Sequence, residues 1–293
     1  MFYLFAVLLH RQTIFDLPKS GKIRNSRDLT LFITHKYLLL PIQEDAGELK
    51  TTILVNDKYF TSLDIRFADK SISYYFPLNT SNWLNKTITL RIDDNGRDTR
   101  ESIFWKEFKN SNDYESYIDY YEQYRPCYHL TPEYGWMNDP NGMFTTIEPN
   151  ENHINSPNIE KEMKSIASNI NNYHYLRESS SLFKGFDVLH HFHFQYNPYA
   201  CVWGNMHWAH AISKDFIRWE YLPLSLCPDE LGQIFSGSAF IDKDNKSGFG
   251  KDSVLAYYTS AGAHQQQSMA YSTDKGFTFT KYERNPIIPN EEK

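Results

Sequence analysis

Ala211–Asp215 (AISKD) and Ala270–Asp274 (AYSTD) are two copies of one pattern, 59 positions apart (270 − 211), and they decide how the second half of the chain folds. An aromatic residue follows each copy, Trp219 after the first and Phe279 after the second. Each copy is typical of a strand, a Ser/Asp turn and a second strand. Repetition of such a unit at a fixed period indicates consecutive blades of a β-propeller, with a chance likeness of two β-hairpins as the alternative.

The first part of the chain predicts a different all-β unit. Thr87–Asp93 alternates strictly between apolar and polar residues, which is the period of a half-buried strand. Clusters of Asn, Asp, Gly and Ser separate it from three similar runs, as in a small antiparallel sandwich. These runs are Lys36–Ile42, Thr52–Val55 and Ile72–Phe76. We therefore expect an accessory β-sandwich-like domain at 30–109, followed by a polar, Tyr-rich linker at 110–124.

Composition limits the function classes. With 293 residues and 41% hydrophobic content, the chain can form one large domain or two ordinary ones. A net charge of −6 gives no basic surface for nucleic acid, so we expect no nucleic-acid partner. The three widely spaced cysteines fit neither a disulfide framework nor a Cys-rich zinc site.

The N-terminal segment 1–29 has no clear assignment. Its apolar run Phe2–Leu9 is too short to span a membrane, and neither a basic region nor a clear cleavage site flanks it. A degraded signal peptide and a buried first strand remain equally compatible with the run. We predict no transmembrane segment.

Trp136–Gly142 (WMNDPNG) contains the carboxylate, Asp139, that we expect to be the main candidate functional group. Pro fixes φ, Gly permits positive φ, and Asn and Asp tolerate both, so the stretch predicts a tight turn that holds Asp139 at a fixed angle over a pocket. Trp136 and Met137 would supply a flat apolar wall on which a sugar ring stacks. A surface turn with a helix-capping Asp is the alternative.

Three further motifs follow in order: Phe194–Pro198 (FQYNP), Trp203–Ala211 (WGNMHWAHA) and Phe235–Ala239 (FSGSA). Together with WMNDPNG they resemble the successive motifs of glycoside hydrolase family 32, the β-fructosidases, and most of all its levan- and inulin-degrading members. The resemblance implies a five-bladed β-propeller. The fold class we predict is all-β: the N-terminal sandwich-like domain followed by the first two to three blades, at 125–293.

The resemblance also implies an activity and a site. Such enzymes hydrolyse terminal β-D-fructofuranosyl linkages in levan, inulin or sucrose with retention of configuration and without a cofactor. Asp139 would be the nucleophile, and the substrate-binding residues would be Asn138, Gln195, Trp203, Phe235 and Ser236. Asn138 and Gln195 would bond fructose hydroxyls, Trp203 would wall the subsite, and Phe235 and Ser236 would close it from the second blade. The structural alternatives are core packing for Trp203 and Phe235 and a backbone partner for Gln195.

Two motifs of the family are absent from these 293 residues: Arg-Asp-Pro, whose Asp stabilises the transition state, and Glu-Cys, which carries the acid/base. Residues 125–293 also hold at most three repeats of 59, as in a C-terminally truncated member. We therefore expect impaired activity and assign no acid/base in this chain. The alternative is a non-catalytic carbohydrate-binding remnant or a non-functional fragment.

A polar segment at about 146–182, with a helix at Asn158–Ile170, interrupts the family pattern. We interpret it either as a disordered insertion or as a sequence-prediction artefact such as a retained intron. His191 and His193 would share one face of a strand, near His190, His207 and His210, a spacing that can bind zinc. Because the family uses no metal, we predict none. The resemblance implies an extracellular or periplasmic location and leaves the oligomeric state open.

Overall fold

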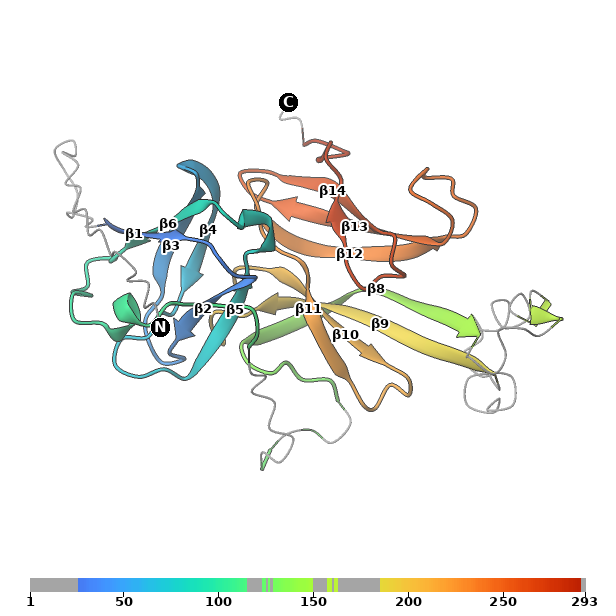
Figure 1. Cartoon of the computed structure of the whole chain (residues 1–293), viewed down its shortest axis with the longest axis horizontal. Coiled ribbons are helices and arrows are strands. Elements are labelled where there is room, and N and C mark those ends of the chain that lie inside the picture. The colour runs from blue at the N-terminus through green and yellow to red at the C-terminus, as the bar shows by residue number, and fades with distance from the viewer. Residues whose placement is uncertain are drawn as a thin grey trace, which may run out of the picture.

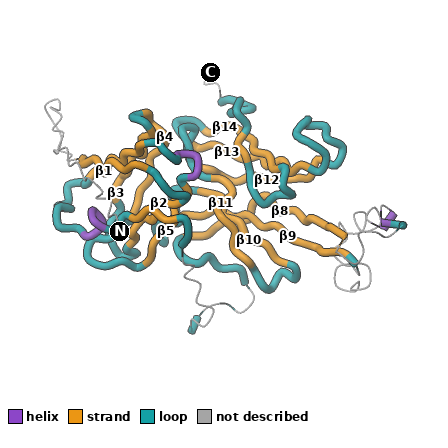
Figure 2. Tube along the Cα trace, in the orientation of Figure 1, coloured by secondary structure: helices purple, strands orange, loops and turns teal. Residues whose placement is uncertain are grey.

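The computed structural model describes residues 26–114, 123–124, 126, 129–149, 157–159, 161–162 and 185–290. Within these ranges the regular structure is β-strand apart from short helical turns, at Ser81–Trp83 (η1), Ile103–Lys106 (η2) and around residues 159–162. The predicted all-β fold is thus confirmed (Figures 1 and 2). Within these ranges, no helix is both long and apolar enough to cross a membrane. The predicted segment 1–29 and the linker lie largely outside the described residues.

The N-terminal unit is a sandwich of two antiparallel sheets that share one apolar core. A four-stranded sheet has the order β1-β6-β3-β4, and a three-stranded sheet has the order β5-β2-β7. The strands are β1 (Ser26–Phe32), β2 (Tyr37–Ile42), β3 (Leu49–Val55), β4 (Lys58–Ile65), β5 (Tyr74–Asn79), β6 (Thr87–Asp93) and β7 (Lys109–Ser111). Asn56 and Asp57, with φ of 48° and 64°, form the tight turn between β3 and β4, because two positive φ values match the twist of a hairpin.

The second half consists of two four-stranded antiparallel sheets, of order β11-β10-β9-β8 and β12-β13-β14-β15. In both, spatial neighbours are also chain neighbours, which is the meander of a propeller blade. The described residues therefore contain two blades (Figure 1). The strands are β8 (Trp136–Pro149), β9 (Phe186–Asn197), β10 (His207–Ser213), β11 (Glu220–Leu226), β12 (Gln233–Asp242), β13 (Ser253–Ala261), β14 (Gln265–Ser272) and β15 (Thr280–Lys281).

The 59-residue repeat falls at equivalent places in the two blades, at the end of the third strand. Ser213 donates to the carboxylate of Asp215 across 3.2 Å, and Ser272 donates to that of Asp274 across 2.6 Å. The residue that follows each of these aspartates has a left-handed backbone, with φ of 60° at Phe216 and 64° at Lys275. The repeat therefore reflects one blade geometry used twice.

The predicted turn at Trp136–Gly142 is wrong. These residues start the long strand β8, which pairs with β9 and is interrupted by two β-bulges. In the first bulge, Asn138 and Asp139 together face the single residue Gln195. Gly142, with φ of 44°, lies in the second bulge, between Asn141 and Phe144, where a positive φ is tolerated, and Pro140 is the first residue paired after the first bulge.

The polar segment predicted at about 146–182 begins later than expected, since β8 runs to Pro149. Residues 157–159 and 161–162 form a helical turn in which the N–H groups of Lys161 and Glu162 donate to the carbonyl of Asn158. The rest of the predicted helix lies outside the described residues.

Asn205 joins the sandwich to the first blade. Its side-chain carbonyl accepts the N–H of Asp64 at 2.8 Å, and its amide donates to the carbonyl of Asp64 at 2.7 Å. Asn205 has φ of 46°, a conformation that Asn tolerates better than most residues. Nearby, Tyr74 donates to the carbonyl of Pro198 at 3.0 Å and stacks on Tyr134, with ring centroids 4.3 Å apart.

We predict that Asn205→Ala lowers the free energy of unfolding by about 2–3 kcal/mol, because it removes the hydrogen-bond partner of both the backbone N–H and the backbone carbonyl of Asp64. Asn205→Gly, which keeps the left-handed backbone but loses the same bonds, is the control and should lose slightly less. Urea unfolding measures both. A loss below about 0.5 kcal/mol in both variants would show that this joint does not stabilise the chain.

Candidate active site

Asp139 and Ser236 lie against each other although they come from different blades. The exposed Asp139 carboxylate, in the first bulge of β8, accepts a hydrogen bond from the Ser236 hydroxyl across 3.0 Å. Ser236 also lies in a bulge, because Phe235 and Ser236 of β12 face the single residue Thr259 of β13. Bulges re-aim side chains and are common beside active sites. Here two of them direct a carboxylate and a hydroxyl toward each other.

Side chains of the first blade bond the backbone of the bulge in β12, and we call these contacts the blade clamp. Gln195 donates to the carbonyl of Ile234 at 3.0 Å, and the Trp208 indole donates to that of Phe235 at 3.1 Å. Asn141 accepts the N–H of Gly237 at 3.0 Å. The blade clamp connects three consecutive strands of the first blade, β8, β9 and β10, to one stretch of β12.

The remaining predicted residues form the surroundings of Asp139. Asn138 accepts a hydrogen bond from the Trp136 indole at 3.1 Å, which fixes the amide next to the carboxylate in sequence. Trp203 is 57% exposed and meets Phe235 edge to face, with centroids 5.9 Å apart. An exposed indole against a half-buried phenyl ring is the kind of apolar wall that a sugar can contact.

Gln195, unlike Asn138 and Trp203, is deeply buried. It is 2% exposed, and its amide donates a hydrogen bond to the carbonyl of Ile234. The structure thus places Gln195 in the blade clamp, as in the alternative considered from sequence, and its contact with substrate stays a prediction.

Asn141, Trp208 and two glycines complete the site, and the sequence analysis assigned none of them a role in substrate binding or catalysis. Gly142 has φ of 44°, and a Cβ there would lie 2.8 Å from the Trp208 ring. A Cβ on Gly237 would collide with the backbone carbonyl of Tyr257. Both positions therefore require glycine. The only sequence signal for Asn141 and Gly142 was their place within WMNDPNG.

Three histidines, His191, His193 and His210, form a stack between the blades. The rings of His193 and His210 are 4.2 Å apart and nearly parallel, and those of His191 and His210 are 5.2 Å apart. His193 Nδ1 lies 3.0 Å from the carbonyl of Gly142 and donates to it. Burial lowers the pKa of His191 to about 4 and that of His193 to about 3. These rings are neutral near pH 7.

The rings of the histidine stack lie face to face, whereas metal ligands converge on one point. Among the described residues, no group of three His, Cys, Asp or Glu side chains is arranged to hold a metal ion. The aromatic neighbours Phe277 and Phe279 meet His191 and His193 edge to face, so the stack packs as aromatic filling between the blades.

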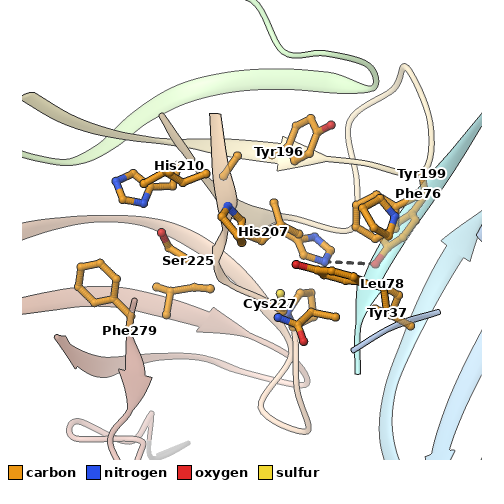
Figure 3. Close-up of a pocket in the computed structure, with 18 of the residues that line it drawn as sticks. Tyr37, Phe76, Leu78, Tyr196, Tyr199, His207, His210, Ser225, Cys227 and Phe279 are labelled. Atoms are coloured by element: carbon orange, nitrogen blue, oxygen red, sulfur yellow. Dashed lines mark hydrogen bonds between the residues drawn. The ribbon is translucent and has the colours of Figure 1, made fainter. Parts of the chain in front are cut away.

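A cavity of about 980 Å³ lies where the sandwich, β11 and the end of the second blade meet (Figure 3). Tyr199, His207, Cys227 and Phe279 are among its lining residues, and the Tyr199 hydroxyl lies 3.4 Å from His207 Nε2. Burial lowers the pKa of His207 to about 3 and raises that of Cys227 to about 11. Asp139 is not on this wall, so the cavity is separate from the candidate active site.

Comparison with known proteins agrees with the motifs. Residues 174–293 match the family described as the glycosyl hydrolases family 32 N-terminal domain. This part of the chain is therefore similar to glycoside hydrolase family 32. Residues 29–128 match a domain of unknown function, DUF4980, over much the same range as the sandwich. The family 32 match begins after Asp139, so the role of that residue rests on the geometry and on WMNDPNG.

Similar proteins include the levanase of Bacillus subtilis, 46% identical over 61% of this chain and 21% of the levanase. The invertase of Schwanniomyces occidentalis is 36% identical over 58% of this chain and 27% of the invertase. The crystal structure of exo-inulinase from Aspergillus awamori is 33% identical, covers 60% of this chain and 31% of its own, and has a TM-score of 0.41. The chain thus spans about a fifth to a third of the length of these relatives.

We predict that stability falls as the pH is lowered from 7 to 5. Unfolded histidines bind protons below about pH 6.5, whereas His193 and His207, with folded pKa values of about 3, do not. Each such histidine makes stability rise with pH by up to about 1.4 kcal/mol per unit in this window. Urea unfolding at pH 7, 6 and 5 measures the slope.

His193→Gln should reduce that slope, because it removes one of the buried histidines whose folded pKa is lowered. Equal slopes in wild type and His193→Gln would contradict a neutral, buried His193.

Proposed function

We propose that this chain carries the nucleophile part of a retaining β-fructosidase site that acts on terminal β-D-fructofuranosyl linkages. The single observation that carries the proposal is the placement of Asp139, which the Ser236 hydroxyl holds across the blade boundary at 3.0 Å. The names of the relatives, a levanase, invertases and exo-inulinases, support levan, sucrose or inulin as the substrate class.

Asp139 would act on the anomeric carbon of the fructosyl unit. Its carboxylate attacks that carbon while the leaving oxygen takes a proton, giving a covalent fructosyl ester that water then hydrolyses. Asn138 and Gln195 would bond hydroxyls of the sugar, and Trp203 and Phe235 would contact its apolar face. No cofactor takes part in this chemistry.

The protonation step needs a second carboxyl group about 5–5.5 Å from the nucleophile. The motifs that carry it in the family are absent from these 293 residues, and general acid–base help is worth about 10²–10⁴ in rate. We therefore propose that the 293-residue chain by itself is impaired toward natural fructans and sucrose.

We assign residues 30–109 to an accessory sandwich and 125–293 to the propeller domain, joined by the linker 110–124. An extracellular or periplasmic location is proposed because relatives such as the exo-inulinase of Aspergillus niger are named as extracellular. A non-catalytic carbohydrate-binding protein is the second candidate, favoured by the exposed Trp203 beside Phe235.

The test uses an activated substrate, p-nitrophenyl β-D-fructofuranoside, whose leaving group needs little protonation. We expect the chain to release p-nitrophenolate at a rate at least 10²-fold above its release of fructose from sucrose, because only the missing acid is bypassed. Asp139→Asn should abolish the release, since the amide is a poor nucleophile.

Ser236→Ala is the companion variant and should slow release without abolishing it. No Asp139-dependent release from the activated fructoside would overturn the enzymatic proposal. Fructan binding without any release would favour the carbohydrate-binding alternative.

A further inference from the structure

Asn141 connects the two bulges that form the candidate site. It lies two residues after Asp139, and its side chain is 2% exposed. Its amide donates to the backbone carbonyl of Asp139 across 3.1 Å, and its side-chain carbonyl accepts the N–H of Gly237 across 3.0 Å. One buried side chain thus bonds the peptide of the proposed nucleophile and the peptide next to Ser236.

Those two bonds close a ring of contacts. Asp139 reaches Ser236 through their side chains, Ser236 continues to Gly237 through the chain, and Gly237 returns to Asp139 through Asn141. In the bulge, Asn138 and Asp139 share one partner residue on β9, so the β8–β9 ladder alone does not hold both of them in regular register. Asn141 supplies a constraint at the place where the ladder is interrupted.

We propose that Asn141 is a positioning residue that sets the carboxylate of Asp139 relative to Ser236 and to the second blade. The chemical consequence rests on the proposed function, while the geometric part does not. A displacement of about 1 Å at a reacting group can cost about 10²-fold in rate. Asn141 touches no substrate in this account and acts only through Asp139 and Gly237.

The side-chain amide is required because the two partners have opposite polarity. The Asp139 carbonyl needs a donor and the Gly237 N–H needs an acceptor, and an amide offers both. Aspartate at this position keeps the acceptor and loses the donor, and alanine loses both. Asn141→Asp and Asn141→Ala therefore separate the two bonds.

Asn197 provides the matched control. It is 1% exposed, donates to the carbonyl of Val202 at 2.9 Å and accepts the N–H of Tyr199 at 3.1 Å. Asn197→Ala thus removes a buried asparagine of the same blade, with bonds of the same kind, that does not contact Asp139. Its effect measures the cost of losing such a residue for structural reasons alone.

The first measurement is amide hydrogen exchange at Gly237 in the full 293-residue chain. We expect Asn141→Ala to speed exchange at Gly237 at least tenfold relative to Ala256 in the neighbouring strand β13, and Asn141→Asp and Asn197→Ala to leave that ratio within twofold of wild type. The Ala256 reference cancels any general loss of stability. An unchanged ratio in Asn141→Ala would overturn the proposal.

The second measurement is the kinetics with p-nitrophenyl β-D-fructofuranoside. We expect both Asn141 variants to lower kcat by about 10- to 100-fold with KM within twofold of wild type. Asn197→Ala should change kcat less than threefold per folded molecule. An equal kcat loss in Asn197→Ala and Asn141→Ala would show a merely structural role and overturn the proposal.

If the wild-type chain releases no p-nitrophenolate, the proposed function fails and the positioning claim is decided separately. Crystal structures of wild type and Asn141→Ala then compare the distance from the Asp139 carboxylate to the Ser236 hydroxyl. We expect that hydrogen bond to be lost in Asn141→Ala and kept in Asn197→Ala. A retained bond in Asn141→Ala would overturn the proposal whatever the activity.

Discussion

The candidate site depends on two β-bulges that face each other across a blade boundary. In each of them two residues oppose one, so backbone groups near the bulge are not fully used by their own sheet. The blade clamp takes up the groups of β12, from the carbonyl of Ile234 to the N–H of Gly237. A typical hydrogen bond contributes about 0.5–1.5 kcal/mol net, but an unsatisfied buried partner costs about 1–3 kcal/mol. Loss of one bond of the blade clamp therefore costs more free energy than the net contribution of that bond, because it leaves a buried polar group unsatisfied.

This arrangement explains why the site residues have such different exposures. Asn141, Gln195 and Trp208 are buried because their polar atoms must reach backbone in the adjacent blade. Asp139, Ser236 and Trp203 remain exposed, and their side chains take no part in the blade clamp. The histidine stack contacts the blade clamp at Trp208, whose ring centroid lies 5.7 Å from that of His193. Because burial lowers the pKa values of His193 and His210, the stack adds no charge to the blade interface near pH 7.

The sequence could predict the features that depend on local pattern. Examples are the strands of the sandwich, the repeat at Ala211 and Ala270, and the motifs that resemble family 32. Strand periodicity and turn preference depend on residues that are close in sequence, so a local pattern predicts them. WMNDPNG shows where local inference ends. Its residues favour a turn, but the many backbone hydrogen bonds between β8 and β9 favour a strand more strongly. The segment therefore forms a strand with two β-bulges instead of a turn. The partners of Gln195 and Asn141 are 39 and 96 residues away, respectively, and no local pattern specifies such pairings.

A crystal structure of the Asp139→Asn chain with bound fructose tests the central claim most directly. The account predicts that the anomeric carbon of the sugar lies over residue 139, with Trp203 and Phe235 against the ring and the contacts of the blade clamp intact. Fructose bound instead in the cavity of about 980 Å³, with the surface around residue 139 empty, would contradict it.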